Sequence, residues 1–315
     1  MIKHGDIVRC PIVAPQDTPL GLKPEPFASK DDMPMFDRRR FVIAAALCAI
    51  AITAARAEAP ADPLLHAAVT SPTRPAAASA RDIYRHPEAS LRFWGLKPGA
   101  TVIDVQPGSG WWTDIIAPYL AQTHGHYIAA GADLANPKIS DGARRDRAAF
   151  EAKYVGKPAV YGDVTVVGFG TVSAPLAPAG TVDLVLVSRE AHNWVRNGFI
   201  TKAFADIYAA LKPGGVLAIE EHRAAPGADP AADTGYLPEA YVIDQARKAG
   251  FKLAARAEIN ANPRDTRDHP FGVWTLPPSR QSAPSGQPAD PAFDHTKYDA
   301  IGESDRMTLK FVKPA

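Results

Sequence analysis

The chain has 315 residues, of which 46% are hydrophobic and 22% charged, so it is long enough for one large or two small domains. Its 35 Lys and Arg against 34 Asp and Glu leave a net charge of +1, and no basic excess argues for nucleic-acid binding. Both cysteines, Cys10 and Cys48, lie before residue 57, so a chain cleaved there has no disulfides and depends on its core.

Residues 1–57 have the features of a leader followed by a secretory signal peptide. Arg38-Arg39-Arg40 precede an apolar run, 41–54, that is too short to span a bilayer. Ala55-Arg56-Ala57 is an A-x-A cleavage pattern. The run from Arg38 to Phe41 also resembles a twin-arginine export signal. We therefore expect an exported, periplasmic protein with no stable membrane anchor after cleavage.

The next residues predict a tether and then one domain. Residues 58–80 are rich in Ala and Pro, as linkers are, and 81–315 are expected to fold together. Leu91 and Trp94 are three apart, which predicts a helix over 88–94.

A strand, a glycine turn and a helix then follow without interruption. The β-branched run 101–105 predicts a buried parallel strand. It ends in Pro107-Gly108-Ser109-Gly110, and apolar residues at helical spacing follow from Trp112 to Leu120. In doubly wound sheets such a turn, with free N–H groups of the helix beside it, binds nucleotide-like ligands. The alternative is an ordinary connection that binds nothing.

The residues of this turn favour one ligand family over another. A dinucleotide fingerprint needs a third glycine or alanine, which this chain lacks. Asp104, Gly108 and Gly110 instead resemble the first motif of class I S-adenosylmethionine (SAM) methyltransferases, D-x-G-x-G-x-G. The resemblance implies that these three residues and Pro107 bind SAM. Gln106 stands at the motif's first glycine, so the turn should differ from the usual one.

Residues 126–130 are a candidate second strand, and Asp133 comes shortly after it. In these folds an acid near this point hydrogen-bonds the ribose hydroxyls, so Asp133 is either a cofactor-binding residue or a loop carboxylate. A helix is predicted over 140–154 and a third strand over 163–169.

The rest of the chain continues to alternate between strands and helices. Strands are predicted over 181–188, 216–220, 251–259 and 307–312, helices over 199–211 and 238–249, and a Pro/Ser/Gly-rich excursion over 281–294. This alternation predicts a mainly parallel sheet. With the methyltransferase resemblance it implies a Rossmann-like α/β fold, with seven strands and helices on both faces.

Several longer motifs resemble one particular family more closely. They are P-G-S-G-W-W-T, A-P-Y-L, H-N-W, E-I-N-A-N-P, D-H-P-F-G-V-W-T-L-P-P and I-G-E-S-D-R-M-T-L. These look like a family of exported bacterial proteins assigned as methyltransferases by fold and motif. The resemblance implies SAM as the cofactor but indicates neither the acceptor nor an activity.

Polar residues after the fourth and fifth strands are the candidates for acceptor chemistry. His192 follows the fourth strand and is the candidate catalytic base. Asn193 and Trp194 are expected to orient and stack a substrate, and His222 reaches the same edge from the fifth strand. The alternative is that His192 and Asn193 satisfy loop backbone groups while Trp194 fills the core.

Three histidines could bind a metal or make structural polar contacts. His192, His222 and His269 with a carboxylate have the right chemistry, but no two of these histidines have local ligand spacing. We therefore expect no metal.

The leading functional hypothesis is a SAM-dependent methyltransferase acting on a small molecule. The alternative is a degenerate methyltransferase-fold binding protein in the periplasm, favoured by Gln106 and by export away from the cytoplasm, where SAM is made. A metal-dependent hydrolase is a third hypothesis.

Overall fold

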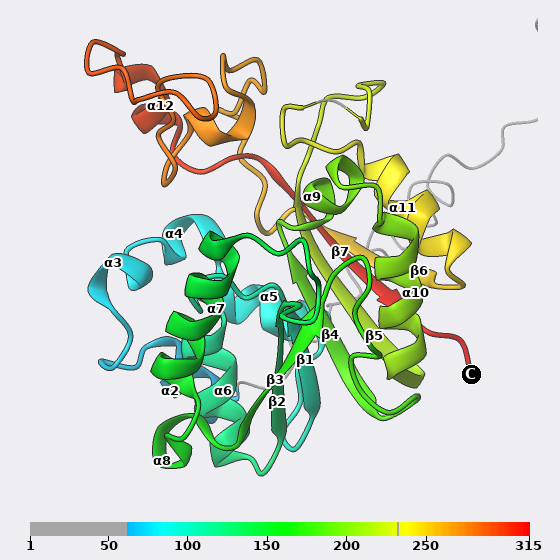
Figure 1. Cartoon of the computed structure of the whole chain (residues 1–315). Coiled ribbons are helices and arrows are strands. Elements are labelled where there is room, and N and C mark those ends of the chain that lie inside the picture. The colour runs from blue at the N-terminus through cyan, green and yellow to red at the C-terminus, as the bar shows by residue number, and fades with distance from the viewer. Residues whose placement is uncertain (1–61, 232) are drawn as a thin grey trace, which may run out of the picture. The chain divides into compact units, whose positions relative to one another are not determined.

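The computed structural model describes residues 62–231 and 233–315, and a seven-stranded sheet is its framework (Figure 1). The strands are β1 (Thr101–Val105), β2 (His126–Ala132), β3 (Val164–Phe169), β4 (Val182–Ser188), β5 (Leu211–His222), β6 (Lys252–Ala257) and β7 (Arg306–Val312). Their order is β3-β2-β1-β4-β5-β7-β6; β1 to β5 pair in parallel, and β7 runs antiparallel between β5 and β6. The predicted Rossmann-like class I fold is confirmed.

Helices cover both faces of this sheet (Figure 1). They are α2 (Pro63–Val69), α3 (Ala76–Ser79), α4 (Asp82–Arg85), α5 (Pro87–Trp94), α6 (Thr113–Gln122), α7 (Asp141–Tyr154), α8 (Pro158–Tyr161), α9 (Ala191–Arg196), α10 (Ile200–Ala210), α11 (Glu239–Lys248) and α12 (Thr296–Ile301), with a 3₁₀ turn, η1 (Gly272–Thr275). Within the described ranges, no helix combines the length and apolar character needed to cross a membrane.

Two apolar clusters hold the layers together. Successive side chains of a strand point to opposite faces, so Val102 joins the cluster with α2, α5, α6 and α7, whereas Ile103 joins the one with α10 and α11. Both residues are fully buried, as the apolar run of β1 predicts. The strands bury side chains on both faces and therefore fix the positions of their carboxyl ends.

The carboxyl edge of the sheet carries a long segment of irregular structure. β5 and β6 are both antiparallel to β7, so β6 ends, and β7 begins, at this edge. The connection between them, residues 258–305, therefore leaves and re-enters the sheet beside the ends of β4 and β5 (Figure 1).

The predicted tether is corrected from Asp62 onward. The signal peptide, its cleavage site and residues 58–61 lie outside the described residues. Asp62 caps α2 and accepts a hydrogen bond from the Tyr119 hydroxyl at 2.7 Å, and Leu65 and Ala68 are buried in the cluster with α6. Alanine favours helices as well as linkers, so composition alone did not distinguish the two.

Candidate active site

The turn after β1 accommodates a glutamine where the methyltransferase motif has glycine. Gln106 adopts a left-handed backbone conformation, with φ 52°, which costs free energy in any residue except glycine. Its side-chain oxygen accepts a hydrogen bond from Trp194 Nε1 at 2.6 Å. This bond to a buried indole offsets the strain and explains how the chain departs from the motif.

The two glycines of the turn have different surroundings. At Gly108, with φ 58°, no atom lies within 4 Å of the position a Cβ would take. At Gly110, with φ 89°, a Cβ would stand 1.9 Å from the Tyr154 hydroxyl, which donates hydrogen bonds in this loop and to Asp114. Gly108 therefore leaves space for a ligand. Gly110, predicted as a cofactor residue, allows α7 to pack instead.

Asp104 is enclosed between β2 and α6. It is 1% exposed, and its Oδ2 accepts a hydrogen bond from the Tyr127 hydroxyl at 2.8 Å; Tyr127 in turn bonds Thr113. Burial raises the pKa of Asp104 to about 7, although the Tyr127 hydrogen bond lowers it. Asp104, which the sequence predicts to bind the cofactor, is therefore buried inside the fold and is linked through Tyr127 to Thr113 at the start of α6.

A cavity of about 220 Å³ opens beside the turn. Its lining residues are Gln106, Pro107, Gly108, Gly131, Ala132, Ala143, Asp146, Arg147, Phe150 and Glu190. Arg147 forms one wall and donates hydrogen bonds to the carbonyls of Ala132 at 2.9 Å and Val167 at 3.0 Å. Pro107 and Gly108 thus lie where the sequence predicted a cofactor site.

Asp133 directly follows β2, because this strand continues two residues beyond its predicted end. Its Oδ1 accepts a hydrogen bond from the amide of Ala135, and its Oδ2 is buried with no partner among the described residues. The open turn at Gly108 fits the polar groups of SAM, whereas Asp133 is not among the residues that line the cavity. The cavity is smaller than the roughly 300–1,000 Å³ of typical ligand pockets, so it would hold part of such a ligand.

A second cavity, of about 210 Å³, shares one lining residue, Glu190, with the first. Its walls come from the ends of β4 and β5, from α9 and from the 258–305 segment. The lining residues are Ser188, Arg189, Glu190, His192, Asn193, His222, Val273, Trp274, Pro277, Pro278, Ser279, Glu303 and Ser304. We call it the histidine cavity.

Residues predicted as a loop after β4 form the short helix α9. This helix directs His192 and Asn193 to the histidine cavity, and the Asn193 amide donates to Glu190 Oε2 at 3.1 Å. Trp194, predicted to stack on a substrate, is 0% exposed and packs edge-to-face against Phe169 in the core. Its alternative role, filling the core, is the one the structure gives it.

His192, Glu221 and His222 meet in this cavity. His192 Nδ1 lies 3.0 Å from Glu221 Oε1, and Ser304 Oγ lies 2.5 Å from His222 Nδ1. Desolvation lowers the pKa of His192, but the charge of Glu221 and its hydrogen bond outweigh this and raise it. Desolvation and the positive charge of His192 lower the pKa of His222 well below its usual value. The pKa values of the two histidines are therefore shifted in opposite directions.

The same three residues are close enough to share an ion. One ligand atom from each lies within 4.8 Å of the others. His269, the third histidine considered from the sequence, instead has its Nε2 2.8 Å from Asp265. Glu221 is the residue that local spacing did not reveal as a partner of His192, since 29 residues separate the two.

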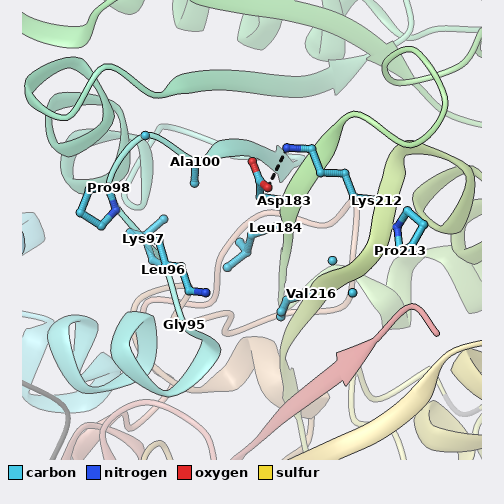
Figure 2. Close-up of a pocket in the computed structure, with 13 residues that line it drawn as sticks. Gly95, Leu96, Lys97, Pro98, Ala100, Asp183, Leu184, Lys212, Pro213 and Val216 are labelled. Atoms are coloured by element: carbon cyan, nitrogen blue, oxygen red, sulfur yellow. Dashed lines mark hydrogen bonds and ion pairs between the residues drawn. The ribbon is translucent and has the colours of Figure 1, made fainter. Parts of the chain in front are cut away.

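A third cavity, of about 370 Å³, lies at the opposite, amino edge of the sheet (Figure 2). Lys212 Nζ and Asp183 Oδ1 form an ion pair there at 2.8 Å, and Asp183 Oδ2 accepts a hydrogen bond from the amide of Thr101. Because Asp183 is already paired on both oxygens and tethers the start of β1, we place the functional site at the carboxyl edge.

Comparisons with known proteins give the following matches. A family model described as a methyltransferase domain matches residues 79–268. Similar solved structures include a SAM-dependent methyltransferase from Aquifex aeolicus (23% identity, TM-score 0.43, covering 57% of this chain and 87% of that one). The [4+2]-cyclase SpnF has 17% identity and a TM-score of 0.47, with 73% of this chain and 81% of that one covered. A TehB-like SAM-dependent methyltransferase from Corynebacterium glutamicum has 18% identity and a TM-score of 0.41, with 75% of this chain and 91% of that one covered. No curated protein matches the chain.

Proposed function

The chain belongs to the methyltransferase domain family, and on this premise we propose that it is a SAM-dependent methyltransferase with a small-molecule acceptor. The observation that carries the proposal is that two cavities share Glu190 as a lining residue. One contains the open turn at Gly108, and the other contains His192. This arrangement supports a cofactor on one side of Glu190 and an acceptor on the other.

When bound, SAM supplies a methyl group on a positively charged sulfur. The backbone of Pro107 and Gly108, which line the first cavity, would hold it, and Asp133 would contribute only if its side chain turned toward the neighbouring lining residues Gly131 and Ala132. Methyl transfer depends mainly on alignment of the methyl group with the acceptor atom and needs little acid–base catalysis.

His192 would act as the general base for a protonated acceptor. Its Nδ1 pairs with Glu221, and no described residue bonds its Nε2. Glu221 thereby fixes the ring orientation and stabilises the imidazolium that forms when Nε2 takes the acceptor's proton. With its proton on His192 Nε2, the acceptor atom would be free to take the methyl group that SAM supplies.

Calorimetric titration of the purified protein with SAM and S-adenosylhomocysteine tests this proposal. Gly108→Asn fills the open turn, and asparagine tolerates left-handed backbone, so we expect at least tenfold weaker SAM binding with folding preserved. Gly180→Asn is the matched control, because Gly180 has φ 70° and is equally open but lies before β4. A folded wild type that binds neither ligand would overturn the proposal.

A binding protein without methyl transfer is the second candidate. It is favoured by Gln106, fixed in the motif's first-glycine position, and by Arg147, which forms a wall of the cofactor cavity. Incubation with methyl-labelled SAM and a metabolite extract separates the two functions. Label transfer to any small molecule excludes this candidate, whereas SAM binding without transfer supports it.

We also propose that the mature protein begins near residue 58 and works in the periplasm. The support is the Arg38–Arg40 cluster, the short apolar run and the A-x-A pattern. Fractionation of the native host, with N-terminal sequencing of the recovered protein, tests this location. An intact chain in the cytosol that retains residues 41–54 would refute it.

A further inference from the structure

Arg189 lines the histidine cavity and, within residues 62–231 and 233–315, forms no ion pair, although its charge lowers the pKa of Glu220 and of Glu303. It follows β4 directly, with a left-handed φ of 61°, and lines the cavity next to Glu190. Its closest polar side-chain contact is from Nε to Ser188 Oγ at 3.5 Å. Among the described residues, no carboxylate lies within ion-pair distance of its guanidinium.

Three more arginines lie beside this cavity and share two buried carboxylates. Glu303 forms ion pairs with Arg81 Nε at 2.6 Å, Arg85 Nε at 3.0 Å and Arg306 Nη1 at 3.3 Å. Arg306 Nη1 also pairs with Glu220 at 2.6 Å. Glu303 lines the histidine cavity, so the shared carboxylate connects the cluster to it.

The arginine cluster has more donors than acceptors. Four nitrogen atoms are buried without a hydrogen-bond partner in the described part of the chain: Arg81 Nη2, Arg85 Nη1, Arg85 Nη2 and Arg306 Nε. Arg85 is 1% exposed, and burial together with the charge of Arg189 lowers its pKa. Buried guanidinium groups normally have their donors paired. Arg85 also lies over the Trp111 ring, 4.7 Å from its centroid, but the cluster still has more N–H donors than its two carboxylates satisfy.

The other two carboxylates at the cavity already have partners. Glu221 is paired with His192. Glu190 Oε2 accepts a hydrogen bond from the Asn193 amide at 3.1 Å. Neither carboxylate forms an ion pair with Arg189, so the guanidinium is left to pair with an anion that enters the cavity.

We propose that the histidine cavity binds an acceptor that carries a carboxylate, and that this carboxylate pairs with the guanidinium of Arg189. A guanidinium presents parallel N–H donors that match a carboxylate, and the pair is stronger where water is excluded. The adjacent hydroxyls of Ser279 and Ser304 line the same cavity. That the bound molecule is the methyl acceptor rests on the proposed methyltransferase function. Binding of an anion at Arg189 does not depend on SAM binding.

Acetate and its neutral isostere acetamide test the anion site. Arginine Nε–H resonances are followed by NMR during titration with each compound at constant ionic strength. We expect a saturable shift at Arg189 with acetate and none with acetamide. Arg189→Gln should weaken acetate binding at least tenfold. Arg189→Lys, which keeps the charge but not the planar fork, should lose less.

The exposed Arg264 provides the matched control, and Arg264→Gln should bind acetate as the wild type does. Equal acetate affinity in Arg189→Gln, or equal responses to acetate and acetamide, would overturn the proposal. A parallel SAM titration identifies the source of the carboxylate. If Arg189→Gln binds SAM with unchanged affinity, the carboxylate belongs to the acceptor, as proposed. If its SAM affinity falls as much as its acetate affinity, Arg189 binds the amino-acid end of SAM, and the proposal is overturned. A wild type that fails to bind SAM removes the methyltransferase proposal but leaves the acetate result readable.

Discussion

Substitution of Asp104 by asparagine should change how the protein's stability depends on pH and should leave SAM affinity nearly unchanged. The folded carboxyl has a pKa of about 7 against 3.8 for the free group, so the folded state holds a proton that the unfolded state has released. Stability contributed by this proton is greatest at low pH and is lost as pH rises towards the folded pKa. Linkage gives a loss of about 2 kcal/mol between pH 5 and pH 7.

Asp104→Asn removes this titration while keeping an oxygen that can accept from the Tyr127 hydroxyl. Urea unfolding at a series of pH values should therefore show the variant gaining about 2 kcal/mol relative to wild type from pH 5 to pH 7. Tyr127→Phe removes the hydrogen bond that lowers the pKa of Asp104, so the pH dependence should become steeper. A difference between Asp104→Asn and wild type that does not vary with pH would refute the reasoning. SAM affinity should stay within twofold, because the carboxylate does not line the cavity.

Three further substitutions test the packing and the charge pair. Gly110→Ala places a methyl group on the Tyr154 hydroxyl at a left-handed position, and should cost about 3 kcal/mol or more in chemical unfolding; a loss below 1 kcal/mol would contradict the packing role. Glu221→Gln removes the charge that raises the pKa of His192, so the His192 imidazole of the variant should titrate at lower pH by NMR. The wild type should be more stable than the variant at low pH, and this difference should disappear as pH rises through the His192 pKa of the wild type. An unchanged His192 titration would exclude the charge pair. Leu65→Ala should cost about 2–5 kcal/mol because the side chain is 1% exposed, whereas a residue in a tether would cost almost nothing.

The centre of the sheet was predictable because β1 and β4 are buried on both faces. Apolar β-branched runs gave β1 and β4 to within one residue, and the alternation with helices gave the parallel core. β2 was predicted too short because Gly131 and Ala132 have weak strand propensity. They remain in the sheet because they pair with Gly168 and Phe169 of β3.

The candidate site was predictable only as far as topology determines it. His192 and His222 meet because β4 and β5 are neighbours with the same direction, and both were placed at this edge from the sequence. Side-chain direction was not predictable, because it depends on partners far away in the chain. Tyr154 beside Gly110 and Gln106 beside Trp194 are examples, at separations of 44 and 88 residues.

The origin of the cavity walls bears on how acceptor choice could change in this family. Residues 79–268 match the methyltransferase model, but Val273, Trp274, Glu303 and Ser304 lie beyond it, in the connection that overhangs the carboxyl edge. The proposed methyl-donor turn is thus built by the shared framework, and much of the acceptor wall by an appended segment. Under the proposed function, exchange of this one segment would redirect the enzyme to a new molecule without disturbing the donor turn.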